Sequence, residues 1–599
     1  MNTSKMKEFP VFILLLWNVC QVDYHMLMEK SLISYMKPYR KECILAPLFK
    51  LLEALLELFV PLVVASIIDY GINNNDVPYI LKMCLLLVGL AILGLSVSIT
   101  AQYFSAKAAS LYSRDVKAAL FRKIESLGKA DLDKVGEATL ITRMTSDMNL
   151  IQNGVNMTLR LLLRSPFVVF GAAIMAFTVN VKAALVFAVT IPLLALAVAL
   201  FMAISLPRFK KVQALLDKVL SRTRENLVGV RVMRAFALEQ SEEKAFKEEN
   251  KSLYLMQIAA SRISILTNPV TSTIINLSII ALLYYGAINV NAGSLSQGEL
   301  VALINYMNQI LVELIKLANL IITITKAINS GYRISDVFHL KSSISYGSAS
   351  EEISEDEAIS FENVSFAYSS GAKNALSDIS FTLKKGEVLG VIGGTGSGKS
   401  TLCALISRLY DASSGSVRLF GREIKDYSES ALSELVSVVL QKARLFKGTI
   451  RSNLQFVKDD ATDDEMNRAL EIARAKEFVE RKGLDATVEA LGKNLSGGQR
   501  QRLSIARAVL KGSRIIVFDD SSSALDYKTE SELRSQLKKI DATLVIVSQR
   551  ASSMLHADNI LVLDGGRVVA SGKHEELLKS SPIYSEIYYT QFEKEEQSV

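Results

Sequence analysis

The chain has 599 residues, 50% of them hydrophobic, and a mean hydropathy of +0.27 that is high for a wholly soluble protein. One hydrophobic core does not support this length, so the composition predicts a membrane portion joined to a soluble one. The net charge of +7 is small and no basic run is interleaved with aromatic residues, which argues against a nucleic-acid partner. The four cysteines and four histidines have neither disulfide nor metal-ligand spacing.

The first 29 residues are expected to be an N-terminal extension without a function. A short apolar run, Val11–Trp17, follows two lysines and resembles a weak signal-peptide core. It is too short to span a bilayer, and no small-residue cleavage site follows it. Met28 offers a second start, and Glu29–Arg40 has the composition of a natural N-terminus.

Residues 30–341 are predicted to form an all-α transmembrane domain with six spans. Six apolar segments are long enough to cross about 30 Å of hydrocarbon: 43–68, 79–101, 160–180, 183–205, 265–288 and 299–325. Lysines and arginines precede the first span and follow the second, whereas the connections 71–76 and 289–297 contain none. This charge distribution predicts a multi-pass protein of the plasma membrane with both termini in the cytoplasm.

Two connections between the spans, about 105–157 and 206–262, are long, charged and helical in pattern. Helices of this length extend well beyond the bilayer. Their tips are predicted near Glu125–Asp133 and Asn226–Phe236. Because loops this long without a function are uncommon, we expect the tips to contact a soluble domain; the alternative is a pair of merely solvated loops.

Polar residues recur at helical spacing within two of the predicted spans. They are Lys50, Glu53 and Glu57 in the first span and Asn305, Asn308, Gln309, Glu313 and Lys316 in the sixth. One interpretation is local pairing, of Lys50 with Glu53 and of Glu313 with Lys316. The other is a water-filled translocation cavity, whose net acidic lining favours amphipathic cations.

The composition changes to serine, glycine and acidic residues over 342–357, which predicts a linker. Beyond it, over 358–599, apolar runs alternate with helical patterns. This alternation predicts an α/β domain with a largely parallel sheet. The runs are Ile359–Phe366, Ile379–Leu383, Val388–Ile392, Arg514–Phe518 and Thr543–Val547.

One of these runs leads directly into a phosphate-binding pattern, G-x-x-x-x-G-K-[ST], which predicts a nucleoside triphosphate site. Backbone N–H groups of a glycine-rich loop wrap an anion, Lys399 reaches the β- and γ-phosphates, and the Ser400 hydroxyl ligates Mg²⁺. The loop consists of Gly393, Gly394, Thr395, Gly396, Ser397, Gly398, Lys399, Ser400 and Thr401.

Five further short motifs accompany this loop in a definite order: Val364–Tyr368, Val439–Gln441, Leu495–Gln499, Arg514–Asp519 and Ser523–Asp526. Their order and identity resemble the P-loop nucleotide-binding domain of ABC transporters, and the six spans resemble the membrane domain of ABC exporters. The resemblance covers about residues 30–590. It implies ATP as the nucleotide.

The resemblance also implies roles for individual residues. Tyr368 is expected to stack on adenine, Gln441 to touch Mg²⁺ and sense the membrane helices, and Asp519 to organise Mg²⁺. Leu495–Gln499 matches the family's signature motif, in which a helix N-terminus faces the γ-phosphate held by the opposite subunit. The residues expected to act there are Ser496, Gly497, Gly498 and Gln499, together with Asp526. A dimer is therefore required.

Three residues depart from the family pattern. Asp520 stands where efficient members have glutamate, Gln549 stands where they have histidine, and Ala490 replaces a glutamate before the signature. A carboxylate that is one methylene shorter loses its position in line with the reaction, and an amide carries no positive charge. An impaired site beside an intact signature resembles the degenerate-site subunit of heterodimeric bacterial ABC multidrug exporters. The alternative is that both replacements are tolerated in a working site.

The sequence thus predicts half of an ATP-driven exporter, paired with a different ABC half-transporter in the lipid bilayer. Drug-like amphipathic small molecules are the cargo expected from the resemblance. Two alternatives stay open at this point: a homodimeric or regulatory ATP-binding membrane protein, and a lipid or peptide exporter.

Overall fold

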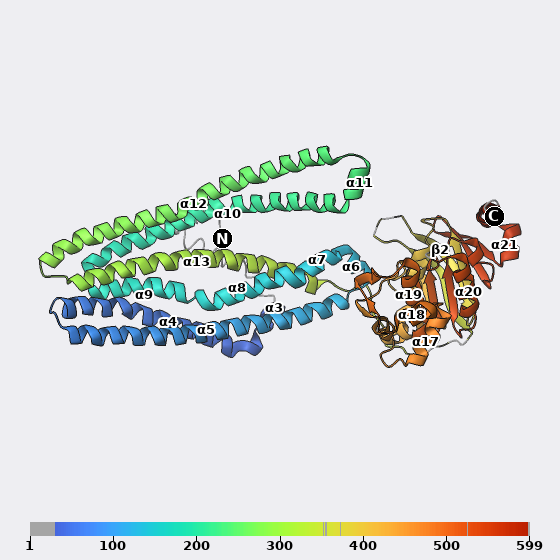
Figure 1. Cartoon of the computed structure of the whole chain (residues 1–599), viewed down its shortest axis with the longest axis horizontal. Helices are drawn as coiled ribbons and strands as arrows, with labels where there is room; N and C mark the ends of the chain where they lie inside the picture. The colour runs from blue at the N-terminus through green and yellow to red at the C-terminus, as the bar shows by residue number, and fades with distance from the viewer. Residues whose placement is uncertain are drawn as a thin grey trace. The chain divides into compact units, whose positions relative to one another are not determined.

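The computed structural model describes residues 30–596 except 351–352, 354–355, 370, 372 and 524. The predicted N-terminal extension lies outside the described residues. The chain folds into two compact units: a membrane unit, which runs to Glu125 and continues over Ala138–His339, and a soluble unit, which combines Ser126–Glu137 with the chain from Leu340 onward (Figure 1).

The membrane unit is a bundle of long helices. In chain order they are α3 (Lys30–Ser34), η2 (Lys37–Tyr39), α4 (Arg40–Ser66), η3 (Ile67–Ile72), α5 (Val77–Glu125), α7 (Glu137–Thr142), η4 (Arg143–Asp147), α8 (Met148–Leu161), α9 (Arg164–Val179), α10 (Val181–Val228), α11 (Val230–Ala235), α12 (Glu239–Asn291) and α13 (Gln297–His339). Each predicted span lies within these helices, and the third is divided between α8 and α9.

Within the described residues, five helical segments are long and apolar enough to cross a membrane. They are Leu32–Ile72, Val77–Glu125, Glu137–Val179, Val181–Val228 and Glu239–Asn291. The sixth predicted span lies in α13, which is not among these five. It is a 43-residue helix that packs against α4, α8 and α9. The membrane domain is therefore all-helical, as predicted. Helix α13 differs from the five other segments in its apolar character.

Side chains of α4, α9, α10, α12 and α13 form the apolar core of the membrane unit. Small residues at the helix contacts, such as Ala172 and Ala176 of α9 and Ala183 and Ala184 of α10, allow the backbones to approach closely. In contrast, large apolar side chains of α5 point outward, and Leu85 is 72% exposed. An exposed apolar surface of this kind is suited to contact with lipid.

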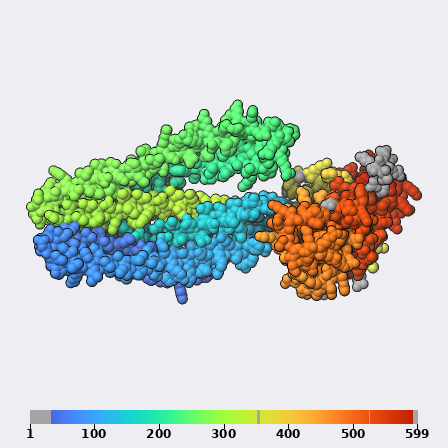
Figure 2. Space-filling view, viewed as in Figure 1, coloured from blue at the N-terminus to red at the C-terminus, as the bar shows by residue number. Residues whose placement is uncertain are grey.

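The helices α10 and α12 form an arm that is closed by the short helix α11. The two long helices pack along each other, and Figure 2 shows the arm separating from α8 and α13 towards α11. Next to α11, Val228 is 83% exposed and Phe236 is 72% exposed. The structure thus places α11 at the second predicted tip, whereas its contact with a soluble domain stays a prediction.

The soluble unit contains a six-stranded sheet in the order β12-β11-β3-β10-β9-β6 and a four-stranded sheet in the order β2-β1-β4-β5. The strands of the larger sheet are β12 (Arg567–Gly572), β11 (Asn559–Asp564), β3 (Val388–Gly393), β10 (Thr543–Val547), β9 (Ile515–Asp519) and β6 (Val436–Val439). All of its neighbouring strands are parallel except β12, which is antiparallel to β11. The predicted α/β domain is therefore confirmed.

The smaller sheet is antiparallel throughout, so the domain is less uniformly parallel than predicted. Its strands are β1 (Glu357–Phe366), β2 (Leu376–Lys384), β4 (Ser414–Leu419) and β5 (Arg422–Glu423), and a separate pair consists of β7 (Gly448–Thr449) and β8 (Thr487–Val488). The helices are α14 (Lys399–Ile406), α15 (Glu429–Leu435), α16 (Ile450–Gln455), α17 (Asp463–Ile472), α18 (Lys476–Lys482), α19 (Gly497–Lys511), α20 (Tyr527–Leu537), α21 (His574–Ser580) and α22 (Pro582–Glu596).

The central strands of the larger sheet position the site. Every residue of β9 is buried, and so is almost all of β3, as expected of strands that are covered on both faces. β10 pairs in parallel with β3 on one side and with β9 on the other. The loops that follow these three strands therefore emerge at the same edge of the sheet, where ligands of open α/β sheets bind.

The short helix α6 (Lys129–Val135) belongs to the soluble unit, although it follows the long membrane helix α5. The Tyr410 hydroxyl donates to Asp133 Oδ2 at 2.6 Å, and the Ser343 backbone N–H donates to Asp131 Oδ2 at 2.7 Å. The first predicted tip therefore packs into the soluble unit, as expected, and does not form a solvated loop.

Tyr410→Phe is expected to loosen α6 without unfolding the soluble unit. Burial and the bond to Asp133 raise the pKa of Tyr410, so the phenol stays protonated and donates this bond throughout the neutral range. Its loss is worth on the order of 1 kcal/mol. Hydrogen exchange over 126–137 should become about fivefold faster. Tyr589→Phe, at an exposed tyrosine of α22, is the matched control, and equal exchange in the two variants would contradict the role of this contact.

Candidate nucleotide-binding site

The predicted phosphate loop connects the end of β3 to the start of α14. Gly398, which precedes α14, has φ +99°, a left-handed conformation that favours glycine. A Cβ atom there would lie 2.6 Å from Leu376 Cδ2, and one at Gly393 would lie 2.1 Å from the Leu563 carbonyl oxygen. At Gly394 and Gly396, however, a Cβ atom would meet nothing within 4 Å. The loop is thus packed tightly at both ends and open in its middle.

The ammonium group of Lys399 lies under this loop. The residue is 7% exposed, and its Nζ donates to the carbonyl oxygens of Gly393 at 2.8 Å and Gly394 at 2.7 Å. Burial lowers the pKa of Lys399, although Asp520 and Asp519 oppose this effect. These partners are neutral oxygens, so the charge of Lys399 can also act on an anion such as a phosphate.

Oxygen-bearing side chains lie beside the loop at the ends of β6 and β9. Ser400 Oγ donates to Asp519 Oδ1 at 2.9 Å, and Gln441 Nε2 donates to Asp520 Oδ2 at 3.1 Å. Burial raises the pKa of both aspartates. Hydroxyl, amide and carboxylate oxygens suit Mg²⁺, which takes few protein ligands beside phosphates and water. The described residues contain no cluster of three or more His, Cys, Asp or Glu that could hold a metal.

Asp520 is held in an uncommon backbone conformation. Its φ is +45°, its N–H donates to the Val547 carbonyl at 3.0 Å, and its carbonyl accepts from Ser523 Oγ at 3.0 Å. Such a conformation persists only when the surrounding structure enforces it. The backbone of Asp520 is therefore fixed, and the reach of its carboxylate depends on the length of the side chain.

Gln549 lines the same cavity as the phosphate loop, and a neighbouring ion pair holds its segment in place. Its carbonyl accepts from Gln591 Nε2 at 2.8 Å. The next residue, Arg550, donates to Glu530 Oε2 at 2.5 Å and to the Leu525 carbonyl at 3.2 Å. Glu530 is only 1% exposed. The sequence analysis missed Glu530, because an acidic residue on an amphipathic helix such as α20 is usually exposed to solvent. Its contact with Arg550 in the structure shows that it is buried and paired.

The residues of the loop and strand ends surround one cavity of about 340 Å³. It is lined by Tyr368, Ala375, Thr395, Gly396, Ser397, Gly398, Lys399, Ser400, Thr401, Gln441, Asp519, Asp520, Val547 and Gln549. The predicted site residues from five separate stretches of the chain thus come together. Gly393 and Gly394 complete the loop behind Lys399.

Tyr368 lies at the rim of this cavity. Its hydroxyl is 2.9 Å from Thr401 Oγ1, and Phe366 and Tyr410 contact its ring edge to face. The residue is 56% exposed, which leaves aromatic surface free for stacking. Tyr410 was not predicted; it supports Tyr368 and also contacts Asp133 of α6.

The signature residues lie outside this cavity. Ser496 caps α19: Gln499 N–H donates to Ser496 Oγ at 3.3 Å, and Ser496 N–H donates to Gln499 Oε1 at 3.0 Å. Ser496 and Gly497 are exposed, whereas Gly498 is half-buried. Asp526 is also exposed and caps α20 by accepting from the Thr529 N–H at 3.0 Å. The structure therefore brings neither Ser496–Gln499 nor Asp526 to the phosphate loop of the same chain.

A second polar cavity, of about 460 Å³, lies in the membrane unit between α4, α9 and α13. Arg164 donates to Glu313 Oε1 at 2.5 Å and to Glu57 Oε2 at 2.7 Å. The predicted local pairs are also present, Lys50 with Glu53 at 2.5 Å and Lys316 with Glu313 at 2.8 Å. In the lining of this cavity two acids, Glu57 and Glu313, thus face two bases, Arg164 and Lys316.

The predicted net acidic lining is therefore replaced, in this cavity, by a balance of charges. Its cause is Arg164, which the sequence analysis did not single out because an arginine at the start of a predicted span is typical of a membrane interface. In the structure this arginine belongs to the buried face of α9, where it is 6% exposed.

The fold and the two cavities define a multi-pass membrane protein with an attached nucleotide-binding domain. The family model "ABC transporter transmembrane region" matches residues 43–314, and the model "ABC transporter" matches residues 376–523. A Bacillus subtilis protein, the uncharacterized ABC transporter ATP-binding protein YfiB, is 34% identical over 571 residues, covering 95% of this chain and 99% of YfiB. The chain belongs to the ABC transporter family and is an ATP-binding, ATP-hydrolysing transporter protein.

Two further comparisons concern exporters. The B. subtilis protein YgaD, described as a putative multidrug export ATP-binding/permease protein, is 29% identical and covers 94% of this chain and 99% of YgaD. A solved structure of a bacterial Atm1-family ABC exporter with ATP bound matches with a TM-score of 0.77 at 22% identity, over 92% of this chain and 98% of that one. The chain therefore shares the overall fold of an exporter.

Proposed function

We propose that this chain is one half of a heterodimeric ABC exporter that moves amphipathic, drug-like compounds out across the plasma membrane. In this dimer it supplies a weakly hydrolytic ATP site and an intact signature motif. The observation that carries the proposal is the combination of Asp520 and Gln549 in the chain's own cavity with an exposed signature at Ser496–Gln499 outside it.

The residues of the cavity fit Mg²⁺-ATP. Lys399 and the open middle of the loop would receive the β- and γ-phosphates, Tyr368 would stack on the adenine, and Ser400, Gln441 and Asp519 would hold the metal. When bound, Mg²⁺ neutralises the charge that develops on the phosphates. Lys399 would supply a buried positive charge to the same groups, and the contacts of its Nζ with the neutral carbonyl oxygens of Gly393 and Gly394 support this role.

Slow hydrolysis at this site follows from the reach and the charge of two side chains. The backbone of Asp520 is fixed, so its carboxylate lies one methylene further from an attacking water than a glutamate would. Misplacement by about 1 Å costs on the order of 10²-fold in rate. Gln549 donates and accepts hydrogen bonds but offers no positive charge to the γ-phosphate. The site therefore retains ATP more than it hydrolyses it.

The exposed signature is proposed to complete a hydrolytic site on a second, different ABC half-transporter. Ser496 and the N–H groups of Gly497 and Gly498 open the 15-residue helix α19, whose N-terminus favours an anion. Gln499 fixes this end through the capping box, and Asp526 belongs to the same complementing surface. Domain closure on ATP turns the membrane cavity from inward- to outward-facing, with both termini in the cytoplasm.

The polar cavity of the membrane unit supports an amphipathic cargo. Its lining combines Arg164, Glu57 and Lys316 with amide side chains, and apolar valines complete the wall. Glu57 and Lys316 are 44% and 43% exposed, so their charges remain accessible. A balanced cavity of this kind gives no preference for cations over anions.

Purification of the chain alone and together with candidate partner halves tests the heterodimer. ATPase activity and vesicle transport should be low for the chain alone and appear only with a partner that has a complete site. Robust turnover by the chain alone would overturn the proposal in favour of a homodimer. Nucleotide-dependent conformational change without transport in any pairing would favour a regulatory protein.

Asp520→Glu is expected to raise hydrolysis at this site on the order of tenfold in the heterodimer, because the longer side chain restores the reach of the carboxylate. The measurement is single-turnover hydrolysis in a heterodimer whose partner site has been inactivated. Asp541→Glu, at an exposed turn, is the matched control and should change nothing. If neither variant changes the rate, the argument from the reach of Asp520 is wrong.

A further inference from the structure

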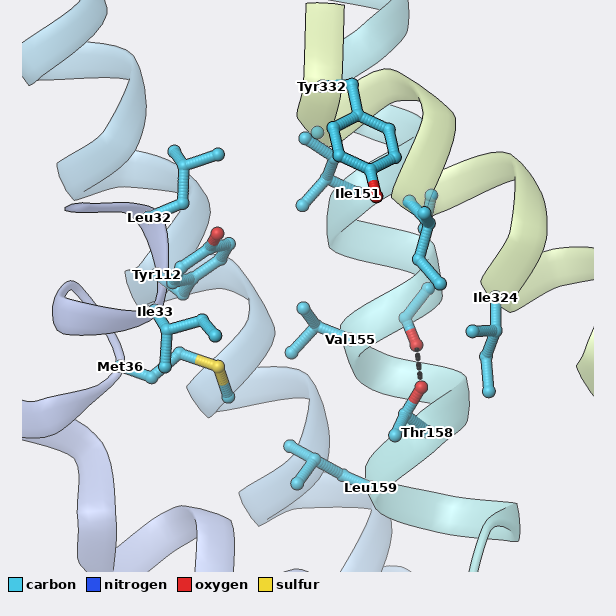
Figure 3. A pocket seen from close by; sticks show the side chains of 14 residues that line it. Leu32, Ile33, Met36, Tyr112, Ile151, Val155, Thr158, Leu159, Ile324 and Tyr332 are labelled. Atoms are coloured by element: carbon cyan, nitrogen blue, oxygen red, sulfur yellow. Dashed lines mark hydrogen bonds between the residues drawn. The ribbon is translucent and has the colours of Figure 1, made fainter. Parts of the chain in front are cut away.

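A cavity of about 260 Å³ in the membrane unit is separate from the polar cavity around Arg164. It lies between α3, α5, α8 and α13. Figure 3 shows Leu32, Ile33, Met36 and Tyr112 on one wall, with Val155 and Ile324 on the opposite wall. Leu32 and Met36 come from α3 and the turn after it, so this short N-terminal helix closes one side of the cavity.

The lining of the cavity is mostly apolar, and its polar side chains are those of Thr158, Tyr112 and Tyr332. The hydroxyl of Thr158 on its wall donates to the Gly154 carbonyl at 2.7 Å and is therefore satisfied. Most of the other lining side chains are aliphatic. Apolar cavities of about 150 Å³ stay dry and take up benzene-sized apolar molecules. This larger cavity therefore suits an apolar occupant such as an alkyl chain.

The level of the cavity along the bundle identifies where such a chain comes from. Its α8 residues, 151–159, immediately precede the predicted third span at 160–180. Its α13 residues, 324–332, lie at the end of the predicted sixth span and beyond it, and Leu32–Met36 precede the first. These three walls therefore lie near the span ends on the side where α4 begins, and Tyr112 of α5 lies beyond the end of the predicted second span at 101. Acyl chains of the leaflet on that side are the apolar molecules that the membrane supplies there.

The charge beside the cavity favours an anionic headgroup. Residues 30–41 include Lys30, Lys37, Arg40 and Lys41 and no acidic residue. Lys37, Arg40 and Lys41 are exposed. The nearest acids on packed elements are already paired: Glu42 with Lys107 at 3.1 Å, and Asp115 with Arg114 at 2.9 Å. Clusters of basic residues at a membrane surface attract anionic lipids.

We propose that this cavity binds one acyl chain of an anionic membrane phospholipid, whose phosphate lies near Lys37 and Arg40. The bound lipid joins α3 to α8 and α13 at the membrane surface. This site is independent of the proposed export function, because none of its residues belongs to the polar cavity or to the nucleotide site.

Photolabelling of the full chain in lipid nanodiscs, with its partner half where assembly requires it, tests the proposal. The probe is phosphatidylglycerol with a diazirine in its acyl chain. Adducts are expected on peptides that contain 151–159 and 324–332. Adducts spread evenly over outward faces, such as that of Leu85, would overturn it.

Gly331→Leu is the discriminating variant, because Gly331 lines the cavity and a Cβ atom there meets nothing within 4 Å. A leucine fills the space without a clash at its Cβ and has a better helix propensity than glycine, so the protein should fold. The adducts on the two peptides should fall about tenfold, because the leucine displaces a few methylene groups. Gly89→Leu, where a Cβ atom also meets nothing, is the matched control. Equal labelling of the two variants would overturn the proposal.

Probes with other headgroups identify the source of the chain. Phosphatidylcholine with the same diazirine chain should label the two peptides several-fold less than phosphatidylglycerol. Equal labelling by phosphatidylcholine would contradict the anionic headgroup. Stronger labelling by a headgroup-free diazirine alkane would show a general apolar pocket and overturn the assignment to a phospholipid.

Discussion

Ser496→Ala should reduce the ATPase activity of the heterodimer on the order of 10²-fold, because it removes a hydroxyl that is proposed to act on the partner's nucleotide. The same change also removes the cap of α19, which is worth about 1 kcal/mol. Ser428→Ala separates the two effects, since Ser428 caps α15 in the same way by accepting from Ala431 N–H at 3.2 Å. Ser428→Ala should lower stability similarly and leave turnover intact.

Lys399→Ala tests whether the hydrolysis takes place at the chain's own site or at the partner's site. Lys399→Ala should release the nucleotide from the chain's own site while much of the turnover remains, because the hydrolysis takes place at the other site. Retained nucleotide and steady-state turnover are measured on the same preparations. If Lys399→Ala abolishes turnover as completely as Ser496→Ala does, the two sites contribute equally, and the proposed asymmetry is wrong.

Arg164→Ala is expected to destabilise the membrane unit by up to about 3–5 kcal/mol, because it removes the guanidinium partner of buried Glu313 and leaves only Lys316 and Ser165 beside that carboxylate. The Glu313 side chain is 4% exposed and that of Arg164 is 7% exposed, so solvent offers little compensation. Thermal unfolding in detergent should show a fall of several degrees. Arg231→Ala, at an exposed arginine of α11, is the matched control.

A double variant separates charge burial from packing at this cluster. Arg164→Met with Glu313→Gln removes both charges and keeps most of the volume, so it should recover much of the stability that Arg164→Ala loses. If the double variant is as unstable as Arg164→Ala, the loss comes from packing, and the ion pair is not its cause.

Most of the predictions for the soluble unit came from local sequence patterns. The apolar run of β3 and its glycine loop belong to one continuous stretch, so the phosphate site was visible in the sequence. Its partner Asp519 was recognisable because it ends an apolar run, and Gln441 because Val439–Gln441 resembles a motif of ABC transporters. Tyr410 and Glu530 were not visible in this way. Their roles come from contacts with Asp133 and Arg550, residues far from them in sequence, and no local spacing marks such contacts.

The predictions for the membrane unit were limited in the same way, because contacts between distant residues leave no local pattern. Hydropathy located the spans, and helical spacing found the face that carries Glu53 and Glu57. It also found the pairs between residues three apart, such as Lys50 with Glu53. Arg164 approaches Glu313 from another helix, and only the packing of α9 against α13 brings the two together. The sign of the cavity's charge therefore depended on a pair that periodicity does not show.

The position of α6 has a consequence for how the chain matures. The soluble unit is discontinuous: its 126–137 segment is synthesised between two membrane helices, long before the remainder from Leu340 onward. The carboxylates of Asp131 and Asp133 therefore cannot accept their hydrogen bonds while α8 to α13 are being synthesised. These bonds form only after Ser343 and Tyr410 have been translated. The soluble unit completes its packing only after the membrane helices are in place. A fragment expressed from Leu340 alone would lack α6 and leave the Tyr410 hydroxyl without its acceptor.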